Sequence, residues 1–132
     1  MQTMPVSAFL SFRGEDEFKV WTLRGLAEFK NLAFTMDDAS LRKAIDSSTD
    51  TYIRSVIRPK VKSCDVCVCL VGENTFRSRK WVPWEIEVAN EEGKRILAMK
   101  FWDTPQAVTP TILTKFGIVP HAWDINWLFQ RM

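Results

Sequence analysis

The sequence predicts an α/β fold of the flavodoxin-like class, a doubly wound parallel sheet of five strands forming one domain over residues 1–132. Two observations predict it. Short apolar runs alternate with amphipathic stretches, which is the pattern of βαβ units with right-handed crossovers. The run 65–71 is the most apolar, as expected of a central strand covered on both faces. The chain is also long enough to bury a hydrophobic core.

The elements of the first half follow from the period of the apolar residues. Val6–Phe12 is a largely apolar run with Gly14 just beyond it, which is typical of a strand. Glu15–Lys30 carries apolar residues among charges and is a helix, and Leu32–Met36 is a short strand after it. Thr49–Lys60 is a second amphipathic helix, and Asp65–Val71 is the central strand.

The second half continues the same alternation. Pro83–Glu92 is a helix, with its proline in the first turn and a glycine just after its end. Ile96–Phe101 is the fourth strand, and Ile118–Pro120 is a short fifth strand at the edge of the sheet. Two short helices are expected at Thr109–Lys115 and Trp123–Phe129.

The composition excludes several classes of function. His121 is the single histidine, so zinc sites built on two or three histidines and mechanisms that use two imidazoles are excluded. Lysine and arginine total 18 against 16 acids, and this balance predicts neither nucleic acid nor a membrane as a partner. No apolar run approaches the roughly 20 residues that span a bilayer, and the N-terminus lacks secretory-signal features. We therefore expect a cytoplasmic protein.

Three cysteines lie in or beside the central strand, at Cys64, Cys67 and Cys69. Side chains alternate between the faces of a strand, so Cys64 is expected to point away from the other two, and three thiolates cannot converge on one metal ion. Their odd number and their clustering argue against a disulfide framework. We therefore expect no metal site and three buried thiols in a reducing compartment.

The predicted topology points to one edge of the sheet. Ligands of doubly wound sheets bind outside the carboxyl ends of the strands, at the switch point in strand order. Glu85 is the acid expected in a cleft there, in the first turn of its helix, half buried on the side of Trp81. The alternative, which these residues alone favour, is an acid that only stabilises its own helix. The segments expected at the edge are Ser11–Gly14, Asp37–Ser40, Gly72–Asn74 and Trp102–Asp103.

Three polar features near this edge leave alternatives open. Arg13 can meet a phosphate in bidentate fashion or pair with Glu15 or Asp16, and the residues favour neither. The connection 37–50 is long for a βα unit, and is either a binding loop or a solvated connection with one helical turn. The basic stretch 74–80 is typical of a solvated loop, with contact to an anionic ligand as the second possibility. Neither common phosphate-cradling glycine motif is present.

Several segments resemble the TIR domain family. Residues 8–16, Ala-Phe-Leu-Ser-Phe-Arg-Gly-Glu-Asp, are similar to the first conserved box of TIR domains. The middle of the chain is closer to the bacterial TIR-like proteins of the Thoeris antiphage system. That resemblance rests on Asp-Ala-Ser-Leu at 38–41, Val-Gly-Glu-Asn-Thr-Phe at 71–76, Arg-Lys-Trp-Val-Pro-Trp-Glu-Ile-Glu at 79–87 and Gly-Lys at 93–94.

The resemblance implies a fold, an activity and partners. The family fold is flavodoxin-like, and many TIR domains cleave NAD+ and release nicotinamide. For this chain it implies an ADP-ribose-derived, cyclic nucleotide signal in antiphage immunity. It also implies NAD+ as a substrate with no other cofactor, a homo-oligomer or filament on activation, and a downstream effector that senses the product.

The resemblance also implies roles for individual residues. The family's catalytic glutamate matches Glu85, which reverses the preference stated above. Nicotinamide is a cationic leaving group that needs no general acid, and one carboxylate can stabilise the oxocarbenium-like ribose it leaves behind. The segment 37–50 matches the BB loop, which often completes the site of a neighbouring subunit. The residues expected to bind the substrate are Ser11, Phe12, Arg13, Asp38, Ser40 and Trp81.

Two other functions use the same residues. The chain can be a non-catalytic TIR interaction or adaptor module that signals by TIR–TIR assembly, with Glu85 as a structural cap. A flavodoxin-like protein that binds a nucleotide or flavin is the third hypothesis.

Overall fold

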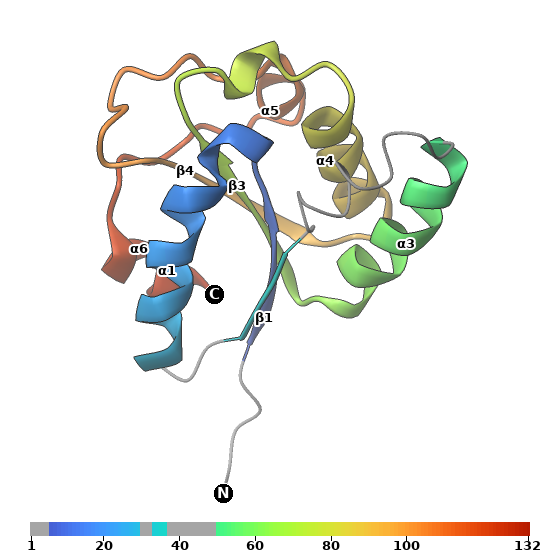
Figure 1. Ribbon diagram of the computed structural model, residues 1–132, viewed down its shortest axis with the longest axis horizontal. Helices are drawn as coiled ribbons and strands as arrows, with labels where there is room; N and C mark the ends of the chain where they lie inside the picture. Colours follow the sequence, from blue (N-terminus) through green and yellow to red (C-terminus); the bar gives the residue numbers. More distant parts are fainter. Residues whose placement is uncertain (1–5, 30–32, 37–49) are drawn as a thin grey trace, which may run out of the picture.

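The computed structural model describes residues 6–29, 33–36 and 50–132 (Figure 1). A parallel four-stranded sheet in the order β2-β1-β3-β4 runs through this part of the chain. This order matches the flavodoxin-like order 2-1-3-4-5 up to its fourth strand. The α/β class and the parallel sheet are therefore confirmed. The strands are β1 (Ser7–Ser11), β2 (Ala33–Met36), β3 (Val66–Val71) and β4 (Arg95–Lys100).

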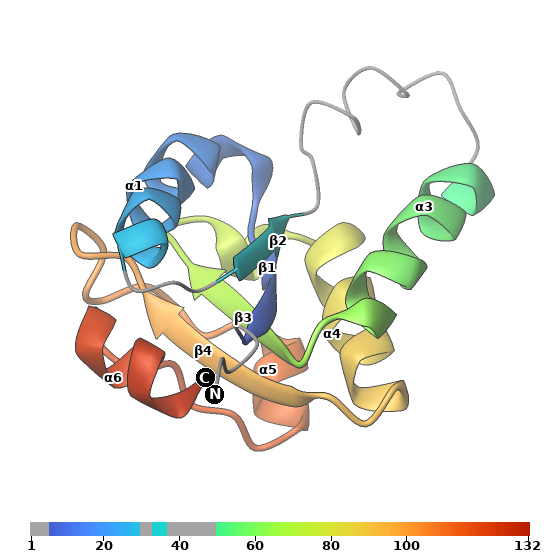
Figure 2. The ribbon, with the colours of Figure 1, turned by 90° about the horizontal axis from the view of Figure 1, so that it is seen from below.

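Helices cover both faces of the sheet, as Figure 2 shows. One face carries α1 and α6, and the other carries α3, α4 and α5. The doubly wound arrangement follows from the crossovers, which place consecutive helices on one face or the other of a parallel sheet. The bounds are α1 (Glu17–Phe29), α3 (Asp50–Ser63), α4 (Trp81–Glu91), α5 (Thr111–Lys115) and α6 (Ile125–Arg131).

Alternation along β3 divides the core into two clusters. Every residue of β3 is buried, as its continuous apolar sequence predicts. Val68 and Leu70 pack with α1 and α6, whereas Cys67 and Cys69 pack with α3, α4 and α5. The period of two residues therefore fixes which face each side chain of this strand serves.

Cys64 departs from the predicted alternation. It is buried in the same cluster as Cys67 and Cys69, so the expectation that it faces away from them is wrong. The reason is that β3 begins only at Val66, and strand geometry does not extend back to Cys64. All three thiols are free, and no group of three metal-ligating side chains occurs in the described ranges.

The predicted fifth strand at Ile118–Pro120 is wrong. Within the described chain the sheet ends at β4, and one parallel bridge joins Met99 to His121. The Lys100 N–H donates to the His121 carbonyl at 2.8 Å, and the His121 N–H donates to the Ala98 carbonyl at 2.9 Å. Pro120 has no N–H to extend this ladder, so the segment stops at a single bridge.

The ends of α4 show one agreement and one difference. Gly93 has a φ of 69° just after the helix, which confirms the predicted glycine cap. The helix starts at Trp81, two residues before the predicted Pro83. No helix described here is both long and apolar enough to cross a lipid bilayer.

Candidate active site

Glu85 and Ser11 form a buried polar pair between α4 and the carboxyl end of β1. The Ser11 hydroxyl donates to Glu85 Oε1 at 2.9 Å, and both side chains are 0% exposed. Val82, Ile86 and Ala89 bury the same side of α4 in the core, which fixes the direction of Glu85. The half-buried position predicted for Glu85 is therefore wrong, since the carboxyl group is fully enclosed.

The true start of α4 also changes the electrostatics of Glu85. Because Trp81 is the first helical residue, Glu85 lies in the second turn, and the first turn holds no acid. A proline is tolerated at any first-turn position whose N–H lacks an intrahelical acceptor, so the sequence could not fix the start of the helix. The helix dipole acts mainly within the first turn, and it therefore favours the charge of Glu85 less than predicted.

Two thiols of β3 lie close enough to Glu85 to be affected by its charge. Burial raises the pKa of Cys69 to about 12, and the Glu85 carboxylate adds to that rise. Burial also raises the pKa of Cys67 well above its usual value, with smaller contributions from Cys69 and Glu85. Both groups remain neutral thiols near pH 7, so they do not supply a thiolate nucleophile beside Glu85.

Arg13 ties the loop after β1 to the loop after β3. Its Nε lies 2.9 Å from Glu15 Oε1, and its guanidinium donates to the Asn74 carbonyl at 2.8 Å. The Asn74 amide donates in turn to Glu15 Oε2 at 3.3 Å. Of the two alternatives for Arg13, the structure contains the ion pair with Glu15, and this network holds the two loops together.

The other predicted substrate-binding residues are distributed around Glu85 unevenly. Phe12 is buried among residues that pack against α1, so its ring does not share the Ser11–Glu85 face of the sheet. Trp81 is half buried at the start of α4, with its ring 6.1 Å from the Trp84 ring in an edge-on arrangement. Asp38 and Ser40 lie outside the described residues.

Asp16, which the sequence suggested only as a partner for Arg13, is a buried acid at this edge. Asp16 is only 5% exposed and is the last residue of the 3-10 turn Gly14–Asp16. Its carboxylate lies directly against Gly72, just after β3. Lys19 Nζ lies 3.6 Å from Asp16 Oδ1 and 3.0 Å from a carboxylate oxygen of Asp103. The glycine directly after β3 was the sequence signal for this contact, because a residue without a side chain allows such a close approach.

Asp16 gives the folded chain a predictable pH dependence. Burial raises the pKa of Asp16 above 3.8, by more than the charge of Lys19 lowers it. The Asp16 carboxyl group therefore binds a proton more tightly in the folded chain than in the unfolded chain. As the pH rises from 3.8 through the raised pKa of Asp16, the stability of the fold decreases. We expect Asp16→Asn to melt a few degrees above the wild type at pH 7, with a gain that shrinks toward pH 4. Thermal melts from pH 4 to 8 measure this, and a difference independent of pH would contradict it.

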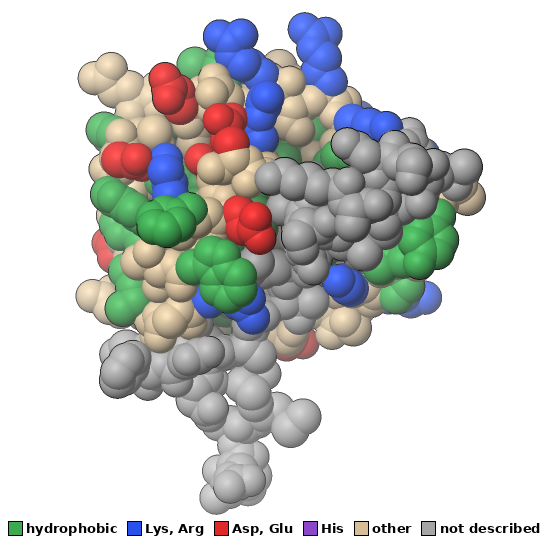
Figure 3. All heavy atoms as spheres, in the orientation of Figure 1, with side chains coloured by type: hydrophobic (Ala, Val, Ile, Leu, Met, Phe, Trp, Pro, Cys, Tyr) green, Lys and Arg blue, Asp and Glu red, His purple; other side chains and the backbone are tan. Residues whose placement is uncertain are grey.

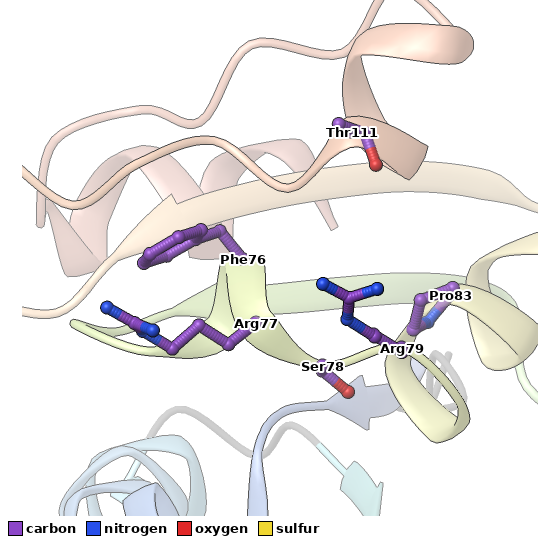
Figure 4. Close-up of a pocket in the computed structure, with 6 residues that line it drawn as sticks. All are labelled: Phe76, Arg77, Ser78, Arg79, Pro83 and Thr111. Carbon is purple, nitrogen blue, oxygen red and sulfur yellow. The ribbon is translucent and has the colours of Figure 1, made fainter.

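A separate cavity of about 690 Å³ lies between the loop after β3 and the starts of α4 and α5. Figure 4 shows its lining, in which Arg79 extends between Phe76 and Pro83 toward Thr111. Of the predicted site residues that the structure describes, none lines it. The other described residues in the lining are Arg77 and Ser78.

Comparisons with known proteins agree with the resemblance found in the sequence. The family model described as "Thoeris protein ThsB, TIR-like domain" matches residues 9–106. A protein of Bacillus cereus (strain MSX-D12) named "Putative cyclic ADP-D-ribose synthase ThsB1" is 28% identical over 100 residues, which are 73% of this chain and 52% of that protein. The chain thus spans about half the length of this curated relative.

A solved structure provides a comparison of the fold alone. The 2-desoxiribosyltransferase from Leishmania mexicana matches with a TM-score of 0.58 and 14% sequence identity. The match covers 86% of this chain and 73% of that one. At this identity the likeness extends to the arrangement of helices and strands and carries no conclusion about activity.

Proposed function

Since this chain belongs to the TIR-like domain family of the Thoeris protein ThsB, we propose that it cleaves NAD+, with Glu85 as its catalytic carboxylate. The observation that carries the proposal is the buried Ser11–Glu85 pair at the carboxyl end of β1. That edge is where doubly wound sheets bind ligands. A fully buried carboxylate is costly to a fold, and such groups concentrate at functional sites.

The chemistry needs one well-placed negative charge. As the bond between the ribose C1′ and the nicotinamide nitrogen breaks, its electron pair goes to the nitrogen and neutral nicotinamide leaves. The ribose becomes an oxocarbenium-like cation, which Glu85 stabilises in a site of low dielectric. Capture by water gives ADP-ribose, and capture by a nucleophile within the same nucleotide gives a cyclic product.

The enclosure of Glu85 has a consequence for activity. Because the side chain is 0% exposed, a ribose reaches the carboxylate only after neighbouring groups move. Part of the binding energy of the substrate must drive that movement, so the isolated chain is expected to have low activity. Assembly of several copies supplies a source of such energy, and we propose that the active form is an oligomer.

The identity of the product is open to a direct test. The name of the Bacillus cereus relative supports a cyclic product. Purified chain incubated with NAD+ in water enriched in oxygen-18 would be examined by mass spectrometry. A cyclic product is one water lighter than ADP-ribose and carries no label, whereas a hydrolysed product carries one labelled oxygen. Release of neither nicotinamide nor a nucleotide at any protein concentration would count against the proposal.

Ser11 is proposed as a positioning residue for Glu85. Ser11→Ala removes the 2.9 Å hydrogen bond and leaves the carboxylate less firmly oriented. We expect kcat to fall by about tenfold with little change in KM, since the bond orients the charge that acts in the transition state. Ser63→Ala is the matched control, because the Ser63 hydroxyl bonds only locally to the Lys60 carbonyl on α3. A loss confined to KM, or an equal loss in the control, would contradict this role.

Assembly without catalysis is a second candidate function. Phe18 is 85% exposed and Trp21 is 55% exposed, one turn apart on α1. Figure 3 shows hydrophobic side chains at the surface on this side of the molecule. Large exposed aromatic side chains of this kind favour contact with another protein. Specific binding to another TIR domain, with no binding or turnover of NAD+ in any assembly state, would favour this function.

A further inference from the structure

The cavity beside α4 is built on a well-anchored turn. The 3-10 turn Thr75–Arg77 follows β3, and the buried Thr75 hydroxyl accepts the Gly72 N–H at 2.7 Å. The Ser78 N–H donates to the Thr75 carbonyl at 3.0 Å, which continues the turn. These bonds hold the backbone that carries Phe76, Arg77 and Arg79 along one wall of the cavity (Figure 4).

Among the described residues, the charge at this cavity is positive and has no acidic partner. Arg77 and Arg79 are exposed, and among the described residues neither forms an ion pair, whereas Arg13, Lys19 and Arg58 each do. None of the described residues that line the cavity is acidic. The first turn of α4, which contributes Pro83 to the wall, also holds no acid to offset the positive end of its helix dipole.

The walls also offer an apolar surface for a planar ring. Phe76 is 38% exposed, and the Arg77 guanidinium lies 4.9 Å from the centroid of its ring. Arg79 points between Phe76 and Pro83 toward the Thr111 side chain (Figure 4). A volume of about 690 Å³ lies in the range of small-molecule sites. A cation, a hydroxyl and an aromatic face in one cavity suit a ligand with both phosphate groups and a ring.

We propose that this cavity binds the diphosphate group of a nucleotide, with Arg79 as the principal phosphate partner and Arg77 as the second. The site is distinct from the proposed catalytic carboxylate. Pro83 and Glu85 are two residues apart on α4, and helical geometry turns them about 200° away from each other. The ligand is therefore a nucleotide bound in addition to the substrate. The alternative occupant of the cavity is the diphosphate group of the substrate itself.

Calorimetric titration with ADP tests the site without relying on NAD+ cleavage. We expect ADP to bind the wild type and adenosine, which lacks phosphates, to bind at least about tenfold more weakly. Arg79→Gln should weaken ADP binding by about tenfold or more, and Arg77→Gln by less. Lys62→Gln removes one exposed charge from α3 and should leave ADP binding unchanged.

Competition separates the two sources of the diphosphate. Repeating the ADP titration on Glu85→Gln protein saturated with NAD+ should leave ADP affinity unchanged if the nucleotide is a second ligand. Displacement of ADP by NAD+, with Arg79→Gln weakening both ligands alike, would assign the cavity to the substrate's own diphosphate. Absence of ADP binding at millimolar concentration, or binding unchanged when both arginines are replaced, would overturn the proposal. Each outcome is independent of whether the chain cleaves NAD+.

Discussion

Glu85→Gln is expected to reduce NAD+ cleavage by about 10²–10³-fold while the chain remains folded. The amide keeps an oxygen that can accept the Ser11 hydroxyl, so the local geometry survives. It lacks the negative charge that stabilises the ribose cation, so the loss falls on kcat. A neutral amide is also less costly to bury than a carboxylate, and we expect no loss of thermal stability. Steady-state rates and thermal melts of the same preparations measure both effects.

Glu87→Gln is the matched control for this change. It removes the same charge from the same helix two residues later, where the side chain is 45% exposed and lies 3.6 Å from Lys115 Nζ. Exposed ion pairs of this kind contribute about 1 kcal/mol or less, so activity and stability should both stay close to the wild type. Wild-type activity in Glu85→Gln would refute the catalytic role. A large fall in its melting temperature would instead indicate a structural acid.

Gly72→Ala is expected to cause the largest loss of stability among the substitutions considered. A Cβ atom at this position would overlap Asp16 Oδ2 and lie 2.9 Å from Asp16 Cγ. Asp16 is only 5% exposed and therefore has little room to move away. We expect a loss of about 1–3 kcal/mol, seen as a fall in melting temperature of several degrees.

A double substitution identifies the cause of that loss. When Asp16→Ala has removed the carboxylate, Gly72→Ala should destabilise the chain by at least about 1 kcal/mol less than it does in the wild type, because the two residues are in direct contact. Gly25→Ala on α1 is the control, since nothing lies within 4 Å of its added Cβ, and it should stabilise the chain by up to about 1 kcal/mol. If the double substitution lost as much stability as the two single substitutions together, the contact between Asp16 and Gly72 would not be the cause of the loss.

Local periodicity was enough to predict the parallel sheet and the buried stripe of α4, though not the full burial of Glu85 beside that stripe. The apolar run of β3 and the stripe of Val82, Ile86 and Ala89 on α4 both appear in the sequence at their expected spacing. The resemblance then indicated which acid and which serine to examine. Their hydrogen bond joins two segments far apart in the chain, and the structure contains it.

Features that depend on long-range contacts could not be predicted in the same way. The burial of Asp16 depends on its approach to Gly72 in the loop after β3, far along the chain, which no local pattern records. The segment near Pro120 had the composition of a strand, yet only His121 bridges to β4. The predicted sites at Asp38 and Ser40 lie outside the described residues and stay predictions.

Nicotinamide release from NAD+, followed over a range of protein concentrations for the wild type and Glu85→Gln in parallel, tests the proposed NAD+ cleavage most directly. The wild type should release nicotinamide, with one ADP-ribose-derived product for each nicotinamide and a rate that rises more steeply than the protein concentration. Glu85→Gln should release little above background. Equal release by both proteins, or none by the wild type at any concentration, would contradict the assignment of Glu85 as the catalytic carboxylate.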